Sequence, residues 1–192
     1  MDIHKEIVIR ILLSIFFIAF ILKNIITGYR TKLAIRGKSG KMNLVIFNSI
    51  ILGIIGIFYH SDYFILINML DFNVVKIIGL AFMCLACVLG ILTLVKMKDS
   101  WRVGIRPEQK TDLITNGIFR FSRNPFYLSF NFLFFGIFLV YPTLLYLIFY
   151  LTFIITLHAI IKDEEKHLIE QHGDLYKNYK DSVNRYFSLG HK

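Results

Sequence analysis

Residues 117–127 read GIFRFSRNPFY, and this stretch decides how the chain is interpreted. It places Arg120, Arg123, Asn124 and Pro125 directly before FYLSFNFLFFGIFLV, the almost purely apolar segment 126–140. Cations and an amide are costly to bury beside a membrane helix, so such residues usually have a partner or a function. Proline suits the first turn of a helix, where its missing N–H group costs nothing. The stretch therefore predicts a membrane helix with polar residues at its N-terminus.

The rest of the chain has the composition of a membrane protein. Of its 192 residues, 56% are hydrophobic, and the mean hydropathy is +0.60. That apolar fraction is too high for a single soluble domain of this size. Apolar runs near bilayer-spanning length, about 18 residues or more, occupy positions 7–26, 42–59, 74–95, 126–140 and 144–161. The predicted fold is an all-α integral membrane protein with about five transmembrane helices.

Three local patterns refine this fold. Tyr141 and Pro142 separate the last two runs, which predicts a tight helical hairpin. In the third run, small residues recur at Gly79, Ala86, Gly90 and Thr93, as in helices that pack closely in lipid. The tail contains Leu168, Leu175, Tyr179 and Val183 at a spacing that predicts an amphipathic helix lying on the membrane surface, with an interruption at Gly173.

The charges predict the orientation in the membrane. Loop 27–41 carries five Lys or Arg and no acidic residue, and loop 96–124 carries seven Lys or Arg against three acidic residues. By the positive-inside rule both loops face the cytoplasm, so the N-terminus lies outside and the C-terminus inside. The first run is long for a signal peptide and lacks a cleavage site, so we expect it to remain as a membrane helix. Anionic lipid head groups explain the net charge of +9, and no nucleic-acid partner is expected.

Two polar clusters are candidates for chemistry. The first covers residues 109–127, and the second is Lys162-Asp163-Glu164-Glu165 after the fifth run. A hairpin brings both to the same membrane face, where cations and carboxylates beside an apolar cavity could hold a zwitterionic ligand. The alternative is interfacial anchoring by side chains that reach toward the head groups. Glu164-x-x-His167 resembles half of a di-iron site, but the helices supply no second copy, so no metal is expected.

At these clusters the sequence resembles a known family. The matching elements are WR-x-G at 101–104, LIT-x-GIFR at 113–120, RNP-x-Y at 123–127, EE-x-x-L at 164–168 and G-x-x-Y-x-x-Y at 173–179. Together they resemble the isoprenylcysteine carboxyl methyltransferases and their phospholipid-methyltransferase relatives, in the form of a prokaryotic member. The resemblance covers residues 100–187. It implies a catalytic membrane region with a cofactor pocket over residues 96–192. Residues 1–95 carry almost no polar side chains in their three expected membrane helices, which predicts a three-helix membrane scaffold.

The resemblance also implies the chemistry. S-adenosylmethionine would donate a methyl group to the carboxylate of a prenylated cysteine or a similar lipid-linked acceptor, with S-adenosylhomocysteine as product. Arg123, Glu164 and His158 are expected to be catalytic. The residues expected to bind the cofactor are Gln109, Thr111, Asp112, Leu113, Ile114, Gly117, Phe119, Arg120, Asn124, Pro125, Phe126, Tyr127, Glu164 and Glu165.

The sequence departs from the family at several positions and leaves alternatives open. Family members usually carry His where Asn124 stands, Tyr where Phe119 stands, and, in eukaryotes, an arginine where Ile160 or Ile161 stands. A phospholipid N-methyltransferase would need a base for its amine acceptor, with His158 or Glu165 as candidates. A carboxylate acceptor is already charged at neutral pH and needs none. A non-catalytic lipid-binding or transport protein would not use S-adenosylmethionine.

Overall fold

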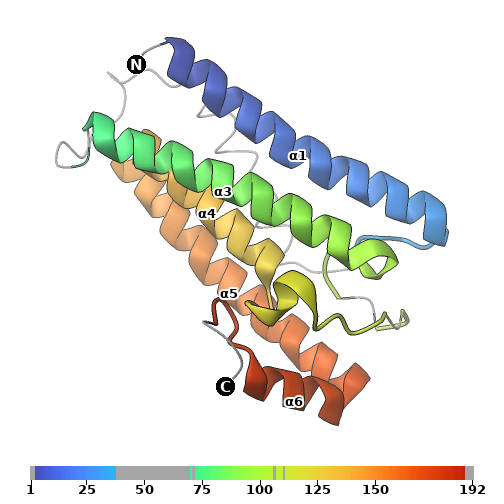
Figure 1. Cartoon of the computed structure of the whole chain (residues 1–192). Coiled ribbons are helices and arrows are strands. Elements are labelled where there is room, and N and C mark those ends of the chain that lie inside the picture. The colour runs from blue at the N-terminus through green and yellow to red at the C-terminus, as the bar shows by residue number, and fades with distance from the viewer. Residues whose placement is uncertain (1–2, 38–69, 71, 106, 110, 189–192) are drawn as a thin grey trace.

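The computed structural model describes residues 3–37, 70, 72–105, 107–109 and 111–188 (Figure 1). Its elements are α1 (Ile3–Thr31), α3 (Asn73–Met97), η3 (Lys98–Ser100), η4 (Gly117–Arg120), α4 (Pro125–Val140), α5 (Leu144–His172) and α6 (Asp174–Ser182). Within the described residues there is no strand, only one isolated parallel bridge between Arg36 and Val103. The all-helical prediction is confirmed. The predicted helix over 42–59 lies outside the described residues.

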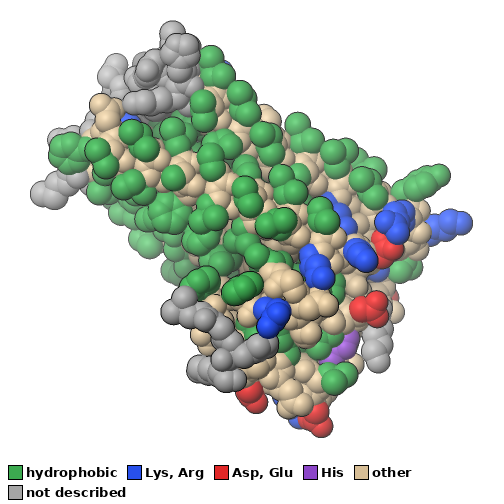
Figure 2. Space-filling view, in the orientation of Figure 1, with side chains coloured by type: hydrophobic (Ala, Val, Ile, Leu, Met, Phe, Trp, Pro, Cys, Tyr) green, Lys and Arg blue, Asp and Glu red, His purple; other side chains and the backbone are tan. Residues whose placement is uncertain are grey.

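The described helices have the lengths and apolarity of a membrane protein. Segments Glu6–Thr31, Asn73–Ser100 and Leu144–His172 are long and apolar enough to cross a bilayer, and α4 is a shorter apolar helix. In Figure 1, α1, α3, α4 and α5 follow one another across the molecule, with α1 against α3, α3 against α4 and α4 against α5. Large apolar side chains of α1, α3 and α5 face outward, as expected for contact with lipid (Figure 2).

Helices α3 and α4 pack with their backbones in contact. A Cβ atom added at Gly79 would lie 2.7 Å from the carbonyl oxygen of Gly136, and one added at Gly136 would lie 2.6 Å from that of Gly79. Ala86, Gly90 and Thr93 are buried along the same helix. The small-residue seam predicted for this helix therefore forms its buried face, and it lets α4 lie close to α3.

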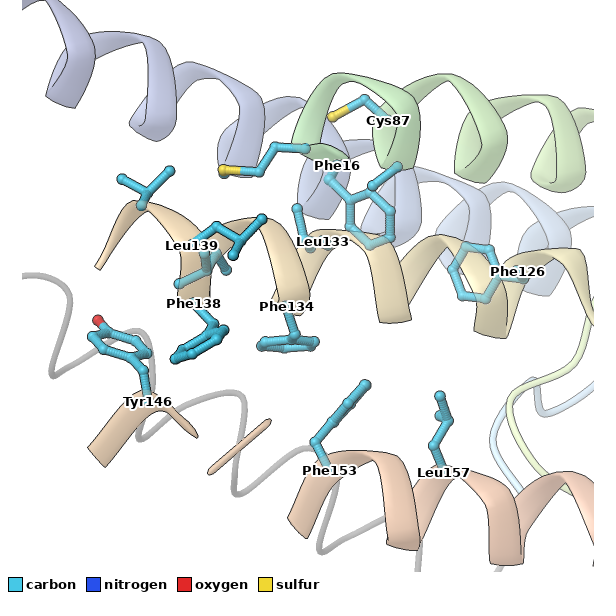
Figure 3. Close-up of a cluster of buried hydrophobic side chains, with 14 of the residues drawn as sticks. Phe16, Cys87, Phe126, Leu133, Phe134, Phe138, Leu139, Tyr146, Phe153 and Leu157 are labelled. Atoms are coloured by element: carbon cyan, nitrogen blue, oxygen red, sulfur yellow. The ribbon is translucent and has the colours of Figure 1, made fainter. Parts of the chain in front are cut away.

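The hairpin of α4 and α5 encloses an aromatic core. Phe134 and Phe153 pack with ring centroids 4.3 Å apart, and Figure 3 shows them facing each other across the two helices. Thr143 caps α5 by accepting a hydrogen bond from the backbone N–H of Tyr146. The turn at Tyr141 and Pro142 lies where the sequence predicts it, and it returns α5 alongside α4.

The tail forms the predicted amphipathic helix, with one correction. Gly173 adopts a φ of +57°, a conformation that suits glycine, and it separates α5 from α6. Tyr176, Tyr179 and Val183 are buried, whereas Leu175 is 71% exposed. The prediction that Leu175 shares the buried face is wrong. The turn at Gly173 resets the helical phase, so Tyr176 takes the inward position instead.

Charged residues gather at one end of the molecule, as Figure 2 shows. At this end Arg30 of α1 pairs with Asp99 at 3.1 Å, and the Lys23 ammonium donates to the carbonyl of Lys98. The indole N–H of Trp101 donates to Asn24 at 2.9 Å. These contacts tie the C-terminal end of α1 to the segment that follows α3.

The close approach of α3 and α4 leads to a stability prediction. Gly79→Val should force the two helices apart and lower the free energy of unfolding by about 1–3 kcal/mol, as overpacking of a well-packed interface does. Thermal unfolding of the purified protein in detergent measures the effect. Ala81→Val is the matched control, because Ala81 is exposed on the same helix. Equal unfolding temperatures for both variants would contradict the backbone contact.

Candidate functional site

A cavity of about 400 Å³ lies at the charged end of the molecule. Its wall is formed by α1, α3, the segment after η3, the start of α4 and the C-terminal half of α5. Most of the lining side chains are apolar, and the charged ones are Arg102, Arg123 and Glu164. The volume lies within the range of about 300–1,000 Å³ that is typical of small-molecule sites.

Aromatic rings make one side of the cavity. Phe20 of α1 stacks on Phe126 of α4 with centroids 5.8 Å apart, and Trp101 meets Phe126 edge-on at 4.7 Å. All three residues line the cavity. Such flat faces accept a planar ring or an acyl chain, and they attract cations through the negative face of the ring.

Glu164 supplies a carboxyl group to the cavity wall. The hydroxyl of Tyr127 donates to its carboxylate at 2.5 Å, and both residues line the cavity. Tyr127 lies in the first turn of α4 and Glu164 near the end of α5. This contact joins the two polar clusters that the sequence placed at one membrane face.

The neighbouring Glu165 holds a buried ionic cluster and does not line the cavity. Arg123 lies 2.9 Å from one carboxylate oxygen of Glu165, Arg185 donates to both oxygens at 3.1 and 2.8 Å, and Asn124 donates at 3.3 Å. Glu165 is only 4% exposed. A buried carboxylate is tolerated when cations and hydrogen bonds offset its lost hydration, as they do here.

Arg123 belongs both to this cluster and to the cavity. Its side chain is 6% exposed, and its two terminal nitrogens bond to Glu165 and to the carbonyl oxygen of Lys180. Its Nε atom is buried and has no hydrogen-bond partner among the described residues. A buried N–H group without a partner is costly, so this cavity-lining arginine retains the capacity to bind an anion.

The segment of residues 183–188, here called the C-terminal strap, runs along the N-terminus of α4. The backbone N–H of Arg123 donates to the carbonyl of Asn184 at 3.1 Å, and that of Ser188 donates to Phe121 at 2.8 Å. The carbonyl of Arg185 accepts from Ser122 and Asn124. Sequence reasoning missed Arg185, because no local pattern links it to residues some sixty positions earlier.

The structure divides the residues expected from the sequence into two groups. Those that line the cavity are Phe119, Arg123, Asn124, Pro125, Phe126, Tyr127 and Glu164. Those that lie away from the cavity wall are Gln109, Thr111, Asp112, Leu113, Ile114, Gly117, Arg120, Glu165 and His158. Phe17, Phe20 and Trp101 also line the cavity, and sequence reasoning did not include them among the expected site residues.

Several residues of the second group support the site from outside. Leu113 and Ile114 pack against the cluster that contains Phe119, and Gln109 accepts a hydrogen bond from Arg102 at 2.5 Å. His158 contacts the Tyr186 hydroxyl through Nδ1 at 2.7 Å. Burial raises the pKa of Tyr186, so its hydroxyl stays protonated at neutral pH.

Comparison with known proteins identifies the family. The sequence profile of the family described as phospholipid methyltransferase matches residues 74–174, more than half of the chain. The fold is similar to that of the eukaryotic intramembrane Ras methyltransferase ICMT (isoprenylcysteine carboxyl methyltransferase), with a TM-score of 0.57 and 20% sequence identity. The similarity covers 81% of this chain and 56% of that one. A search of curated proteins found no match.

These findings agree with the motifs that the sequence shares with membrane methyltransferases. The profile match spans all of α4 and α5 and all but the first residue of α3, and these helices carry much of the cavity wall. The structural similarity, at 20% identity, shows a shared membrane fold. The chain belongs to the phospholipid methyltransferase family, a family of membrane methyltransferases.

Proposed function

We propose that this protein is an S-adenosylmethionine-dependent methyltransferase that acts on the carboxylate of a prenylated cysteine or a similar lipid-linked acceptor. The observation that carries the proposal is the cavity at the charged end of the membrane helices, where Arg102, Arg123 and Glu164 are the charged residues of a mostly apolar wall. Opposite charges in one apolar cavity suit a ligand that carries both a carboxylate and an ammonium group.

The residues of the cavity fit this cofactor. The partnerless Nε of Arg123 would bind the carboxylate of its amino acid part, and the carboxylate of Glu164 would bind the ammonium group. The stacked faces of Phe20, Phe126 and Trp101 would hold the purine or the sulfonium. When bound, the cofactor supplies a methyl group from a positively charged sulfur.

The protein would contribute to methyl transfer by positioning the cofactor and the acceptor and by excluding water from them. A carboxylate acceptor is already deprotonated at neutral pH, so the protein would not need to supply a base to activate it. Holding the two reactants in alignment can lower the activation free energy by up to about 7–11 kcal/mol relative to reactants that are free in solution. Aromatic walls that exclude water favour a step in which opposite charges neutralise each other. Arg102 brings a second cation to the cavity wall, and its charge would favour an acceptor carboxylate nearby.

Methylation of a phospholipid amine is the second candidate, because the family profile carries that description. An amine must lose a proton before attack. The two bases considered from the sequence are engaged elsewhere: His158 contacts Tyr186, and Glu165 pairs with two arginines. Glu164 is then the cavity-lining carboxylate that could accept the proton.

We also propose that the charged end faces the cytoplasm, with the N-terminus outside. The described residues of the two basic loops and the cavity share this end, which supports the positive-inside assignment. The division into a scaffold over residues 1–95 and a catalytic region over residues 96–192 remains a proposal. Phe17, Phe20 and Ile21 of α1 line the cavity, so the proposed scaffold also shapes the site.

Glu164 provides a test of cofactor binding. Glu164→Gln keeps the shape and removes the charge, so the affinity for S-adenosylhomocysteine should fall about tenfold or more, the size expected when a charge-assisted hydrogen bond is lost. Isothermal titration calorimetry in detergent measures this change. Glu170→Gln is the control, because Glu170 is exposed on the same helix. Unchanged affinity in Glu164→Gln would remove Glu164 from the cofactor site.

The acceptor is tested by a radiolabelled methyl assay with two substrates. The proposed function predicts transfer to a farnesylcysteine analogue and little transfer to phosphatidylethanolamine in the same detergent. At saturating cofactor the rate of methyl transfer should not rise with pH in the range where an amine loses its proton, because a carboxylate acceptor needs no deprotonation. Preference for phosphatidylethanolamine, with a rate that rises with pH as the amine loses its proton, would establish the second candidate instead.

Orientation is tested with Lys177→Cys, which places a thiol on an exposed position of α6. A membrane-impermeant maleimide should label it in inside-out vesicles and leave it unlabelled in right-side-out vesicles. The parent protein is the control, since its two cysteines lie within α3. The reverse labelling pattern would invert the proposed topology.

A further inference from the structure

The ionic cluster beside the cavity contains more positive than negative charge. Arg123 and Arg185 both bond to Glu165, and the cluster therefore carries a net charge of about +1. The carboxyl group of Glu164 lies on the cavity wall and is not part of this cluster. The excess positive charge lies next to the cavity, because Arg123 lines it.

We infer that Arg185 is a positioning residue: by binding both oxygens of Glu165 with two of its guanidinium nitrogens, it leaves the positive charge of Arg123 available to an anionic group in the cavity. The inference rests on the proposed function, since it assigns the anion to the carboxylate of the cofactor's amino acid part. Arg185 does not line the cavity and acts only through Glu165 and Arg123.

The hydrogen bonds support this division of roles. Arg185 engages both oxygens of Glu165, whereas Arg123 reaches one oxygen through a single terminal nitrogen. The second terminal nitrogen of Arg123 bonds to a neutral carbonyl, and its Nε has no partner among the described residues. Without Arg185, both oxygens of Glu165 would turn to Arg123, and the net charge of the pair would be about zero.

The backbone of the strap does not depend on the Arg185 side chain. Ser122 and Asn124 bond to the carbonyl oxygen of Arg185, and Ser188 bonds to Phe121. Tyr186 contacts His158 of α5 independently. Replacing the guanidinium group should therefore change the charge beside the cavity while the strap keeps its place.

The experiment compares two ligands by calorimetry with the full-length protein in detergent. S-adenosylhomocysteine carries the amino acid part, and 5′-methylthioadenosine lacks it. Arg185→Gln should raise the Kd for S-adenosylhomocysteine about tenfold, the effect of one unit charge across a partly buried site. Its Kd for 5′-methylthioadenosine should not change. Lys177→Gln is the control, because Lys177 is an exposed cation of α6 that pairs with Asp174.

A double variant separates charge from structure. Arg185→Gln combined with Glu165→Gln again leaves Arg123 as the unbalanced cation, so affinity for S-adenosylhomocysteine should recover toward the wild-type value. A purely structural role predicts no recovery, because the double variant has lost more of the cluster. Recovery of affinity would support the inference directly.

Three results would overturn the inference. Unchanged affinity in Arg185→Gln, equal weakening of both ligands, or a double variant that binds no better than the single one would each remove Arg185 from this role while the proposed function stands. Failure of the wild-type protein to bind S-adenosylhomocysteine would overturn the proposed function and the inference together.

Discussion

The carboxylate of Glu165 joins three segments that are distant in the sequence. Arg123 lies just before the N-terminus of α4, Glu165 lies on α5, and Arg185 lies on the strap after α6. Removal of one partner from a buried ion pair typically costs about 3–5 kcal/mol, because the remaining charge stays out of water. This cluster therefore ties α5 to the start of α4 and to the strap. Successive helical residues point about 100° apart, so the neighbouring Glu164 faces a different direction and lines the cavity.

The position of the cavity follows from the same constraint. Charged groups are costly at the centre of a bilayer and affordable at its edge, so a site with ionic groups lies where the membrane helices end. The rest of the cavity wall is mostly apolar and includes the packed rings of Phe20, Trp101 and Phe126. The site therefore combines a few charged groups with an apolar surface, which suits the proposed reaction between a charged cofactor and a lipid-linked acceptor.

Hydrophobic runs and turn residues in the sequence predicted the helices well, but no pattern in the sequence predicted the C-terminal strap. The run 126–140 corresponds to α4, whose start is set by Pro125, and the run 74–95 corresponds to α3. Helix α5 continues past the apolar run to His172, because charged residues end a membrane span without ending a helix. The roles of Arg185 and Phe20 depend on contacts with residues far along the chain, which neither periodicity nor spacing encodes. Leu175 was misplaced because periodicity cannot follow the turn at Gly173.

The residues just before η4 show how side chains expected at a site can serve it without lining it. Phe119 lines the cavity, and its carbonyl accepts the hydroxyl of Tyr179 at 2.6 Å. Leu113 and Ile114 pack against the hydrophobic cluster that contains Phe119, so they support this part of the cavity wall. Gln109 accepts a hydrogen bond from the guanidinium group of Arg102 and so helps to hold it. Direct binding of the cofactor by Gln109, Leu113 or Ile114 stays a prediction, whereas their contacts with Phe119 and Arg102 already give a physical reason for these residues.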